Sequence, residues 1–402
     1  MDANFFKINR AKLLEKCNGT PIILSAHTEM QKANDEAFPF TQNANFWYLT
    51  GIEAADWRVV ITEEKTTLIA PDISKISQIF NGSLSAEEAM KISGADAIIT
   101  RDEASEFLKN LAKKNGEVWT IFPANQIDFE FILNPSIAKN HAQLKKIFTK
   151  VKDLRPALAK LRAIKTKDEI MMMRRAINLT CATFDMVKNE LQNYIFEYEA
   201  QAKFSYEFER AGAAHAYDPI IASGKSAVTL HYNANRVGLK KDSLVLMDVG
   251  ARYGNYCADL TRTYAFGEVS QRAKDVHAAV QNAQSEIVDL IKPGGVIKTY
   301  MKESDEIIKR ALKSLDLMKN DSDFRKYYPH SIGHGLGIDV HDPLGELHNP
   351  SGEPATFQPG MVLTVEPGIY IADEEIGVRI EDNILVKEDS IENLSGRLST
   401  DL

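Results

Sequence analysis

The stretch LVLMDVGARYGNYCADLTRT, residues 244–263, predicts a β-hairpin that carries two aspartates on one face. The Gly-Asn dipeptide at 254–255 is a strong two-residue turn signal between two β-rich runs. With this turn, Asp248 falls opposite Thr261, and Asp259 lies on the same face as Asp248, ~7–8 Å away at the backbone. Two carboxylates that converge in this way suit a metal site, although ordinary turn or strand-edge acids would show the same pattern.

The stretch HSIGHGLGIDVH, residues 330–341, offers histidines to such a site. The four-residue spacing of His330 and His334 is typical of a zinc site on a helix. Ser331, however, stands where a helical metalloprotease site needs Glu, and the interleaved glycines each cost ~1 kcal/mol in a helix relative to Ala. We therefore expect extended chain here, with at most some of the histidines as metal ligands.

Two further strand-like runs carry an acid each. In GVRIEDN, residues 377–383, strand alternation places Arg379 and Glu381 on one face, and an acid between apolar neighbours is expected to be partly buried, where it needs a partner or a metal. A surface salt bridge is the alternative. In LTVEPG, residues 363–368, Glu366 ends an apolar strand before a Pro-Gly turn, a weaker signal because solvated acids are common there.

Together these residues would form a metal site dominated by oxygen. Four carboxylates balance the charge of two divalent cations, and one imidazole adds a neutral ligand. Without cations the carboxylates would repel one another and have raised pKa values. Such hard ligands favour manganese, with cobalt, iron or zinc as alternatives, over a structural zinc held by Cys and His. Bridging carboxylates can hold two cations ~3.5–4 Å apart with an activated hydroxide between them. The predicted ligands are Asp248, Asp259, His334, Glu366 and Glu381.

The remainder of the chain indicates two domains. Residues 1–155 alternate short β-rich runs with amphipathic helical stretches, which predicts a small α/β domain. Near 155 the pattern changes at Pro156, and Thr166 with Glu169 has the spacing of a capping box at the start of a long helix. Residues 156–402 mix two more helical segments with antiparallel-looking strands, so we expect an α+β second domain.

Composition narrows the class of protein. The 402 residues are 44% hydrophobic and 26% charged, as in ordinary globular proteins, and a single core rarely exceeds ~250–300 residues. The formal charge of −8, with no basic block, argues against a nucleic-acid or membrane partner. The first residues do not resemble a secretory signal, and no apolar run reaches the ~18 residues of a transmembrane helix. The three cysteines are scattered along the chain, which suits a reducing cytoplasm.

The motifs DVG, DLTRT, HSIGHGLG, VEPG and RIED, in this order and spacing, resemble the pita-bread metallopeptidase superfamily, which includes methionine aminopeptidase, aminopeptidase P, prolidase and creatinase. The resemblance covers residues 155–395 or so. It implies a pita-bread catalytic domain in which Asp248 chelates one metal and Asp259 and Glu381 bridge both. His334 and Glu366 would complete the other metal.

The first domain narrows the resemblance to the aminopeptidase P and prolidase group. NDEAFPFTQNANFWYLTGI, residues 34–52, is similar to the signature of the creatinase-type N-terminal domain of these enzymes and looks most like aminopeptidase P. Thr41, where that family often has Arg, and Gly335, where some bacterial members have a bulky aromatic residue, depart from the pattern. These departures bear on substrate preference rather than on the chemistry.

The resemblance also implies roles for residues around the metals. His231 and His341 would contact the substrate and stabilise the developing oxyanion, and His330 would line the pocket or support it. Glu366 would shuttle a proton to the leaving nitrogen while Arg379 braces a bridging carboxylate. Tyr370 would line the pocket, although a core tyrosine is an alternative. The expected catalytic residues are His231, His341, Glu366 and Arg379, and the expected substrate-binding residues are His231, His330, His341 and Tyr370. The remaining histidines are expected to be structural or on the surface: His27, His141, His215, His277 and His348.

The expected reaction is hydrolysis of the bond between an N-terminal residue and a following proline by a metal-bridged hydroxide. Proline makes this bond a special case because it fixes φ and removes the N–H donor. A dipeptide-specific prolidase is the main alternative; a creatinase-like hydrolase and a non-catalytic peptide-binding module are disfavoured by the intact ligand set. We expect peptide substrates with proline in second position and a homodimer or homotetramer, as in similar enzymes.

Overall fold

The computed structural model describes residues 1–123, 132–345 and 354–402. The chain divides into two compact units, Met1–Leu161 and Arg162–Leu402. The boundary expected near residue 155 falls at the start of helix α7 (Arg155–Ala163), whose last two residues belong to the second unit. His348 lies outside the described residues. Within the described part of the chain, no helix combines the length and the apolar character needed to cross a bilayer.

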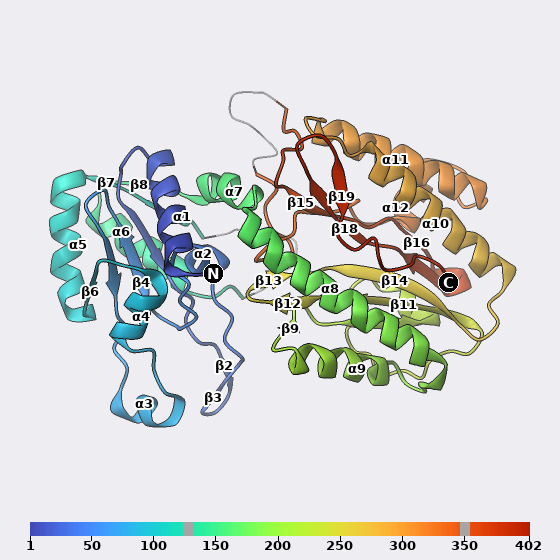
Figure 1. The fold of residues 1–402 in the computed structure, drawn as a ribbon, viewed down its shortest axis with the longest axis horizontal. Helices are drawn as coiled ribbons and strands as arrows, with labels where there is room; N and C mark the ends of the chain where they lie inside the picture. The colour runs from blue at the N-terminus through green and yellow to red at the C-terminus, as the bar shows by residue number, and fades with distance from the viewer. Residues whose placement is uncertain (124–131, 346–353) are drawn as a thin grey trace. The chain divides into compact units, whose positions relative to one another are not determined.

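The first unit is an α/β domain built on a six-stranded sheet in the order β6-β5-β4-β1-β7-β8 (Figure 1). The strand β4 runs antiparallel to both neighbours, whereas β5 and β6 are parallel, as are β1, β7 and β8. Buried residues on both faces of the central strands explain why these runs are almost continuously apolar. The strands are β1 (Ile22–Ser25), β4 (Arg58–Ile61), β5 (Thr66–Ile69), β6 (Ala97–Ile99), β7 (Glu117–Thr120) and β8 (Lys150–Asp153).

Two helices of the first unit begin with capping boxes. Ser85 and Thr100 form capping boxes with Glu88 and Glu103, which fix the starts of α4 and α5. One face of the sheet packs on α5 and α6 through a core that contains Ile23, Val60, Leu108, Val118 and Leu144. The helices are α1 (Ala3–Lys16), α2 (Ala44–Thr50), α3 (Lys75–Asn81), α4 (Ala86–Ser93), α5 (Arg101–Asn115) and α6 (Ser136–Ile147), and a small hairpin is formed by β2 (Gln31–Ala33) and β3 (Glu36–Ala37).

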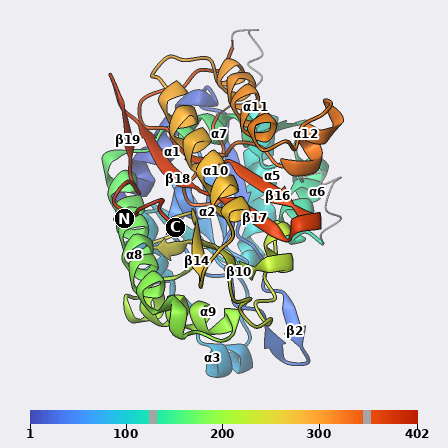
Figure 2. The same ribbon diagram turned by 90° about the vertical axis from the view of Figure 1, so that its right-hand side faces the viewer.

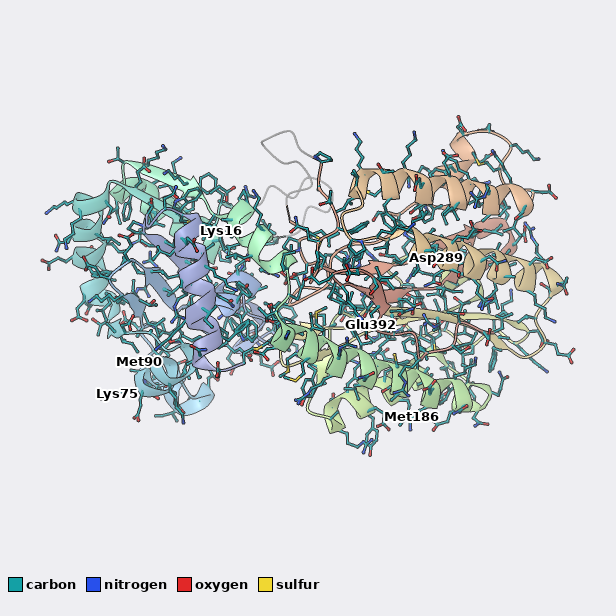
Figure 3. All side chains as sticks on the ribbon, turned by 45° about the horizontal axis from the view of Figure 1, so that its top comes forward. Lys16, Lys75, Met90, Met186, Asp289 and Glu392 are labelled. Atoms are coloured by element: carbon teal, nitrogen blue, oxygen red, sulfur yellow. The ribbon has the colours of Figure 1, made fainter. Side chains whose placement is uncertain are left out.

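The second unit is an α+β domain, as the sequence predicts. Its strands lie between the helix pair α8 and α9 and the helix pair α10 and α11 in Figure 1, and Figure 2 shows α10 crossing in front of the strands. Figure 3 shows that side chains fill the space between these helices and the strands, with Met186 on the outward side of α8. The helices are α8 (Lys167–Glu190), α9 (Glu197–Arg210), α10 (Gln271–Leu290), α11 (Ile297–Ser314) and α12 (Ser322–Tyr327).

Short antiparallel sheets make up the middle of this unit, and each comes from chain segments close in sequence. One sheet has the order β10-β11-β14, a second β13-β12-β9, a third β15-β18-β19, and β16 pairs with β17. The strands are β9 (Ala214–His215), β10 (Ile220–Ser223), β11 (Ser243–Val249), β12 (Ala251–Tyr253), β13 (Tyr256–Cys257), β14 (Leu260–Phe266), β15 (Val362–Val365), β16 (Gly368–Ile371), β17 (Ile376–Arg379), β18 (Asp382–Val386) and β19 (Ile391–Asn393).

The hairpin predicted from residues 244–263 is confirmed with its register. Asp248 pairs with Thr261, and the turn residues Gly254 and Asn255 both have positive φ, of 55° and 69°. This is the conformation that a two-residue turn of right-handed strands requires. At Gly250 the strands approach so closely that an added Cβ would lie 1.9 Å from the Ala258 carbonyl oxygen, so only glycine fits.

The long helix α8 begins where its capping box predicts. Thr166 accepts from the backbone N–H of Glu169, and the Glu169 carboxylate accepts from the backbone N–H of Thr166 at 2.8 Å. The stretch 330–341 contains no helix and runs as irregular extended chain, as its glycines predict. An added Cβ at Gly333 would lie 2.1 Å from the Thr364 carbonyl oxygen, so this segment packs closely against β15.

Candidate active site

A cavity of about 480 Å³ lies within the second unit and gathers most of the predicted site residues. Apolar side chains of Ile220, Leu230 and Val340 form part of its wall. The rest of its lining is polar and charged, which is typical of a site that binds a ligand in a fixed orientation. The predicted residues that line it are His231, Asp248, Asp259, His330, His334, His341, Glu366, Arg379 and Glu381.

The four carboxylates reach this cavity from four different segments. Asp248 lies in β11, and Asp259 lies just before β14 on the same hairpin. Glu366 follows β15 and Glu381 follows β17. An isolated bridge between Thr261 and Glu381 joins the hairpin to the last of these segments. Antiparallel pairing therefore brings residues more than 100 positions apart onto one floor.

Arg262 anchors the same junction from the side away from the cavity. Its guanidinium is 1% exposed and donates to the carbonyl oxygens of Thr261, Glu381 and Leu398 and to the Asp382 carboxylate. A charge buried this deeply is stable only with such a set of acceptors. The bridge that places Glu381 next to the hairpin is thereby held rigidly.

His334 points its Nε2 atom at the carboxylates. Its Nδ1 lies 3.0 Å from the Gly335 carbonyl oxygen, which can only accept, so the ring proton sits on Nδ1. Nε2 lies 3.4 Å from both Asp259 Oδ2 and Glu366 Oε1. A backbone acceptor on one ring nitrogen and an open lone pair on the other is the usual arrangement of a metal-ligating histidine.

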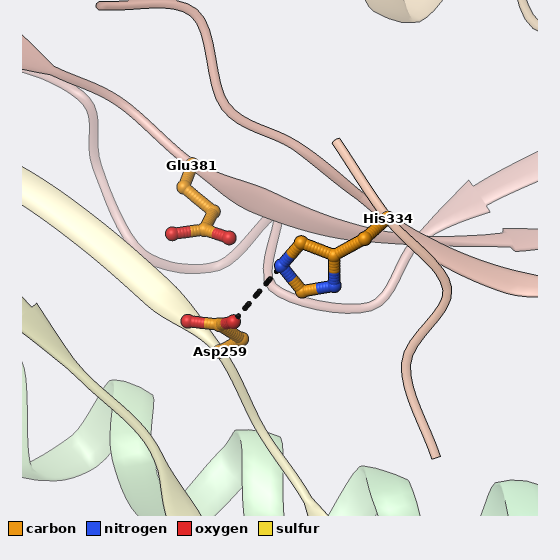
Figure 4. Close-up of side chains that lie close together, drawn as sticks. All are labelled: Asp259, His334 and Glu381. Atoms are coloured by element: carbon orange, nitrogen blue, oxygen red, sulfur yellow. Dashed lines mark ion pairs between the residues drawn. The ribbon is translucent and has the colours of Figure 1, made fainter. Parts of the chain in front are cut away.

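Figure 4 shows Asp259, His334 and Glu381 converging from separate segments, with one ligand atom of each within 4.8 Å of the others. Glu381 Oε2 accepts from the Thr261 hydroxyl at 2.7 Å, whereas Oε1 is buried and has no hydrogen-bond partner among the described residues. An unpaired carboxylate oxygen in a buried site is costly, and a cation would satisfy it. The donor set therefore fits hard divalent cations.

The pKa values of Glu381, Glu366 and His334 are all raised, as expected where buried carboxylates lie close together without a cation. Burial, and then the charges of Asp259 and Glu366, raise the pKa of Glu381 well above its ordinary value. Burial also raises the pKa of Glu366, to about 7, against the opposing charge of His334. Burial lowers the pKa of His334, but the hydrogen bond and charge of Asp259 outweigh it and raise that pKa to about 9. Divalent cations would keep the carboxylates ionised and His334 neutral.

Arg379 occupies the centre of a directed hydrogen-bond network. It donates to Asp248 Oδ2 at 2.5 Å, to the Tyr370 hydroxyl at 2.7 Å and to the Thr261 hydroxyl at 3.1 Å. We expected Arg379 to brace a bridging carboxylate; its direct contact is instead with Asp248, the ligand that the resemblance gives to one metal. Thr261 links it to Glu381, because the Thr261 hydroxyl accepts from Arg379 and donates to Glu381 Oε2.

Tyr370 lies behind the cavity wall rather than among its lining residues. Its hydroxyl accepts from Arg379 and lies 3.0 Å from His330 Nε2. The Nδ1 atom of His330 lies 2.8 Å from the Ser331 carbonyl oxygen and therefore carries the ring proton, so Nε2 accepts from Tyr370. Burial lowers the pKa of His330 to about 4, which keeps the ring neutral.

The other two predicted histidines, His231 and His341, are exposed residues of the lining. His231 follows the short helical turn 224–228, and His341 stacks at a tilt on His334 with ring centroids 4.2 Å apart. Both rings are accessible to a ligand in the cavity, whereas the ligand set lies on its floor. The three histidines of residues 330–341 therefore take three different positions: wall, floor and mouth.

Comparison with known proteins identifies the family. Residues 171–388 match the model of metallopeptidase family M24, and residues 6–121 match that of the aminopeptidase P N-terminal domain. The chain belongs to metallopeptidase family M24.

Similar proteins agree over nearly the whole chain. The M24 chain is 30% identical to a Xaa-Pro aminopeptidase of Haemophilus influenzae over 91% of this chain and 88% of the relative. It is 29% identical to the Xaa-Pro aminopeptidase of Escherichia coli over 97% and 94% of the two chains. The structure of aminopeptidase P from E. coli with the inhibitor Pro-Leu superimposes with a TM-score of 0.86 at 27% identity, over 99% of this chain and 96% of that one. The predicted fold class, a creatinase-type α/β domain before a pita-bread domain, is confirmed.

Tyr217 is a site residue of the M24 chain that the sequence reasoning missed. Its hydroxyl lies 2.5 Å from Asp248 Oδ1 and 2.6 Å from Asp259 Oδ1. One hydroxyl proton can serve only one of two carboxylates, so the pair needs a further positive charge or proton between them. In the structure, the strand that begins after Pro219 pairs Ile220 with Asp248, and this pairing places Tyr217 beside the hairpin. The apolar strand after Pro219 is the sequence feature that could have indicated this position.

A buried ion cluster fixes the chain that carries His341. Asp342 is 1% exposed at its side chain and accepts from Arg162 and, at 3.1 Å, from Lys165. Arg162 also contacts Asp339, whose side chain is 53% exposed. These contacts tie the glycine-rich loop to the segment just before α8. The motif DVHD therefore supplies both a cavity residue and the buried anchor next to it.

We predict that Asp342→Asn lowers the free energy of unfolding by about 3–5 kcal/mol, because it removes the buried counter-charge that Arg162 and Lys165 share. Asp339→Asn removes an equal charge from the same arginine but at an exposed position, and should cost less than about 1 kcal/mol. Urea denaturation followed by intrinsic fluorescence measures both. Equal shifts of the two midpoints would mean that the buried cluster does not anchor the loop.

Proposed function

We propose that this M24 protein is a Xaa-Pro aminopeptidase, a metallo-exopeptidase that hydrolyses the bond between an N-terminal residue and a following proline. One observation carries the proposal: four carboxylates and one histidine imidazole converge on the floor of a single 480 Å³ cavity. The names of the similar proteins support it and do not favour a prolidase. The intact ligand set argues against a creatinase-like hydrolase and against a non-catalytic peptide-binding module.

The metal site is proposed to hold two divalent cations on Asp248, Asp259, His334, Glu366 and Glu381, with manganese as the native pair and cobalt, iron or zinc as alternatives. Four of these five ligands are carboxylates, which favour manganese over softer metals. When bound, the cations supply an activated water nucleophile and polarise the scissile carbonyl. The unpaired oxygen of Glu381 and the open Nε2 of His334 support this assignment.

The histidines of the mouth and wall are proposed to hold the substrate. His231 and His341 reach the cavity from its exposed side, where they can donate to the substrate carbonyl as negative charge develops on its oxygen. His330 and Tyr370 form a fixed wall, since Tyr370 donates to His330 and accepts from Arg379. Tyr370 would therefore act through its neighbours, while Arg379 holds the Asp248 carboxylate in position.

Glu366 is proposed to move the proton. Its Oε1 lies near the Thr364 hydroxyl and His334, whereas its Oε2 lies 3.8 Å from His330 Nδ1 and is less engaged. A proton taken from the nucleophilic water at Oε2 can be delivered to the leaving proline nitrogen. That nitrogen has no hydrogen of its own in the peptide, so its departure depends on such a donor.

We predict that manganese-loaded protein releases the first residue from an Xaa-Pro-Xaa-Xaa tetrapeptide, which mass spectrometry of the products would reveal. An Xaa-Ala-Xaa-Xaa tetrapeptide serves as the control and should be cleaved much more slowly. Cleavage of an Xaa-Pro dipeptide alone would instead make the enzyme a prolidase. No cleavage of either proline peptide would contradict the peptidase assignment.

Two variants should separate metal binding from turnover. Glu381→Ala is expected to lose activity and at least one of the two cations, because it removes a ligand of the floor. His231→Ala is expected to lose turnover by ~10²–10³-fold, as when an oxyanion donor is removed, and to keep both cations. Elemental analysis after gel filtration gives the stoichiometry. A Glu381→Ala protein with full activity and two cations per chain would rule out the dinuclear site.

We also propose a homodimer or homotetramer in the cytoplasm. Ile76, Ile79 and Phe80 of α3 are 69%, 81% and 81% exposed, and a cluster of exposed apolar residues is typical of an interface. Three buried free cysteines suit a reducing compartment.

Light scattering should therefore give a mass of at least twice 44.9 kDa, and Phe80→Glu should lower it because burying a charge at an interface is costly. Ile8→Glu, at another exposed apolar residue of the same unit, should leave the mass unchanged. A wild-type monomer at micromolar concentration would contradict the assembly.

A further inference from the structure

A second cavity, of about 280 Å³, lies within the first unit at the carboxyl ends of its parallel strands. Ser25 and Ala26 at the end of β1 and Ile69 and Ala70 at the end of β5 line it. From these two strands the parallel pairing proceeds outwards in opposite directions, from β5 to β6 and from β1 to β7 and β8. In open α/β sheets, such a reversal of strand order is the usual place for a ligand.

Cations outnumber anions around this cavity. Arg58, Arg101 and Lys139 line it, against the single carboxylate of Asp56. Within the described ranges, none of the three cations has a carboxylate in ion-pair contact. Arg58 is instead held by neutral amide oxygens, those of Asn140 at 2.8 Å and Gln143 at 3.2 Å. Burial and then the charge of Arg101 lower the pKa of Arg58 to about 10, so the two guanidinium groups repel each other across the site.

Two buried donors of the lining are unused. Ser136 is only 9% exposed, and its hydroxyl has no hydrogen-bond partner among the residues that the structure describes. The Nε of Arg58 is likewise buried and unpartnered in the described part of the chain. Buried polar groups normally have partners, so two orphaned donors on one cavity indicate a missing acceptor.

Helix α6 adds the positive end of its dipole to the same place. It begins at Ser136, has no side-chain cap on its N-cap Pro135 and has no acidic residue in its first turn. The N–H of Ser136 donates to Asn134 Oδ1 at 3.2 Å. The next N–H groups have no partner within the helix, so the positive end of the helix still favours an anion. By contrast, the N-terminus of α5 is already satisfied by the capping box of Thr100 and Glu103.

We propose that this cavity binds a phosphate group carried on a small molecule. Arg58, Arg101 and Lys139 supply the charge for a dianion, and Ser136 with the first turn of α6 supplies hydrogen bonds to its oxygens. A phosphate is favoured over a carboxylate because its three peripheral oxygens can accept several hydrogen bonds, and its double charge matches the net charge of three cations and one carboxylate. The volume leaves room for a small group attached to the phosphate. The site lies in a different unit from the carboxylate cluster, so it does not depend on the proposed peptidase activity.

Isothermal titration of the full, manganese-loaded protein with inorganic phosphate and with glycerol 3-phosphate tests the proposal. Both probes should bind, the ester at least as tightly as the free anion. Lys139→Gln should weaken binding by about tenfold, which corresponds to one charge-assisted hydrogen bond. Lys146→Gln removes the same charge from an exposed position near the other end of α6 and should leave binding unchanged. Arg58→Gln should abolish it.

Glu381→Ala separates this cavity from the metal site and should retain phosphate binding. Binding that survives Lys139→Gln and Arg58→Gln but disappears with Glu381→Ala would overturn the proposal, as would no binding at millimolar phosphate. Acetate that binds as tightly as phosphate would overturn the assignment to a phosphate. Because Arg58 is partly buried, the exposed Lys139 variant keeps the test valid even if Arg58→Gln does not fold.

Discussion

The mutual repulsion of four acidic side chains on one cavity floor is the constraint on which the second unit depends. Asp248, Asp259 and Glu381 are at most 9% exposed, so water does little to screen them from one another. One guanidinium, that of Arg379, lies in direct contact with one of them. The remaining charge, the shared hydroxyl of Tyr217 and the unpaired oxygen of Glu381 all call for cations. The donor set of this floor therefore fits divalent cations.

Holding such a floor together requires a rigid frame of buried cations behind it. Arg262 fixes the junction of the hairpin with the segment that carries Glu381, while Arg162 and Lys165 hold Asp342 beside the mouth. Each of these three buried cations donates to acceptors on neighbouring segments. The interactions therefore hold those segments in place as well as neutralising charge. The frame explains why short strands from distant parts of the chain can present ligand atoms within 4.8 Å of one another.

The two units use buried charge in opposite ways. The second unit gathers carboxylates around a cavity and supplies few cations there, whereas the first gathers cations around a smaller cavity and supplies one carboxylate. In both places the imbalance occurs where strand ends and turns leave a hollow, not in the middle of a sheet. The excess of carboxylates in the cavity of the second unit favours divalent cations, and the excess of cations in the cavity of the first unit favours an anion.

The sequence by itself determined the parts of the protein that depend on neighbours along the chain. The turn at 254–255 sets the register that places Asp248 opposite Thr261, and Thr166 with Glu169 sets the start of α8. Both follow from local geometry, because a two-residue turn and a capping box each involve only a few consecutive residues. The family resemblance then supplied roles that spacing alone could not.

Only the tertiary structure decided which side chains meet across segments. Tyr217 joins both aspartates, Arg379 contacts Asp248 rather than Glu381, and Tyr370 lies behind His330 instead of in the cavity. These contacts depend on how separate sheets and helices pack, and side-chain alternation within one strand does not specify the facing partner. The basic cavity of the first unit arises in the same way, since its cations come from β4, α5 and α6 and meet only when the sheet is assembled.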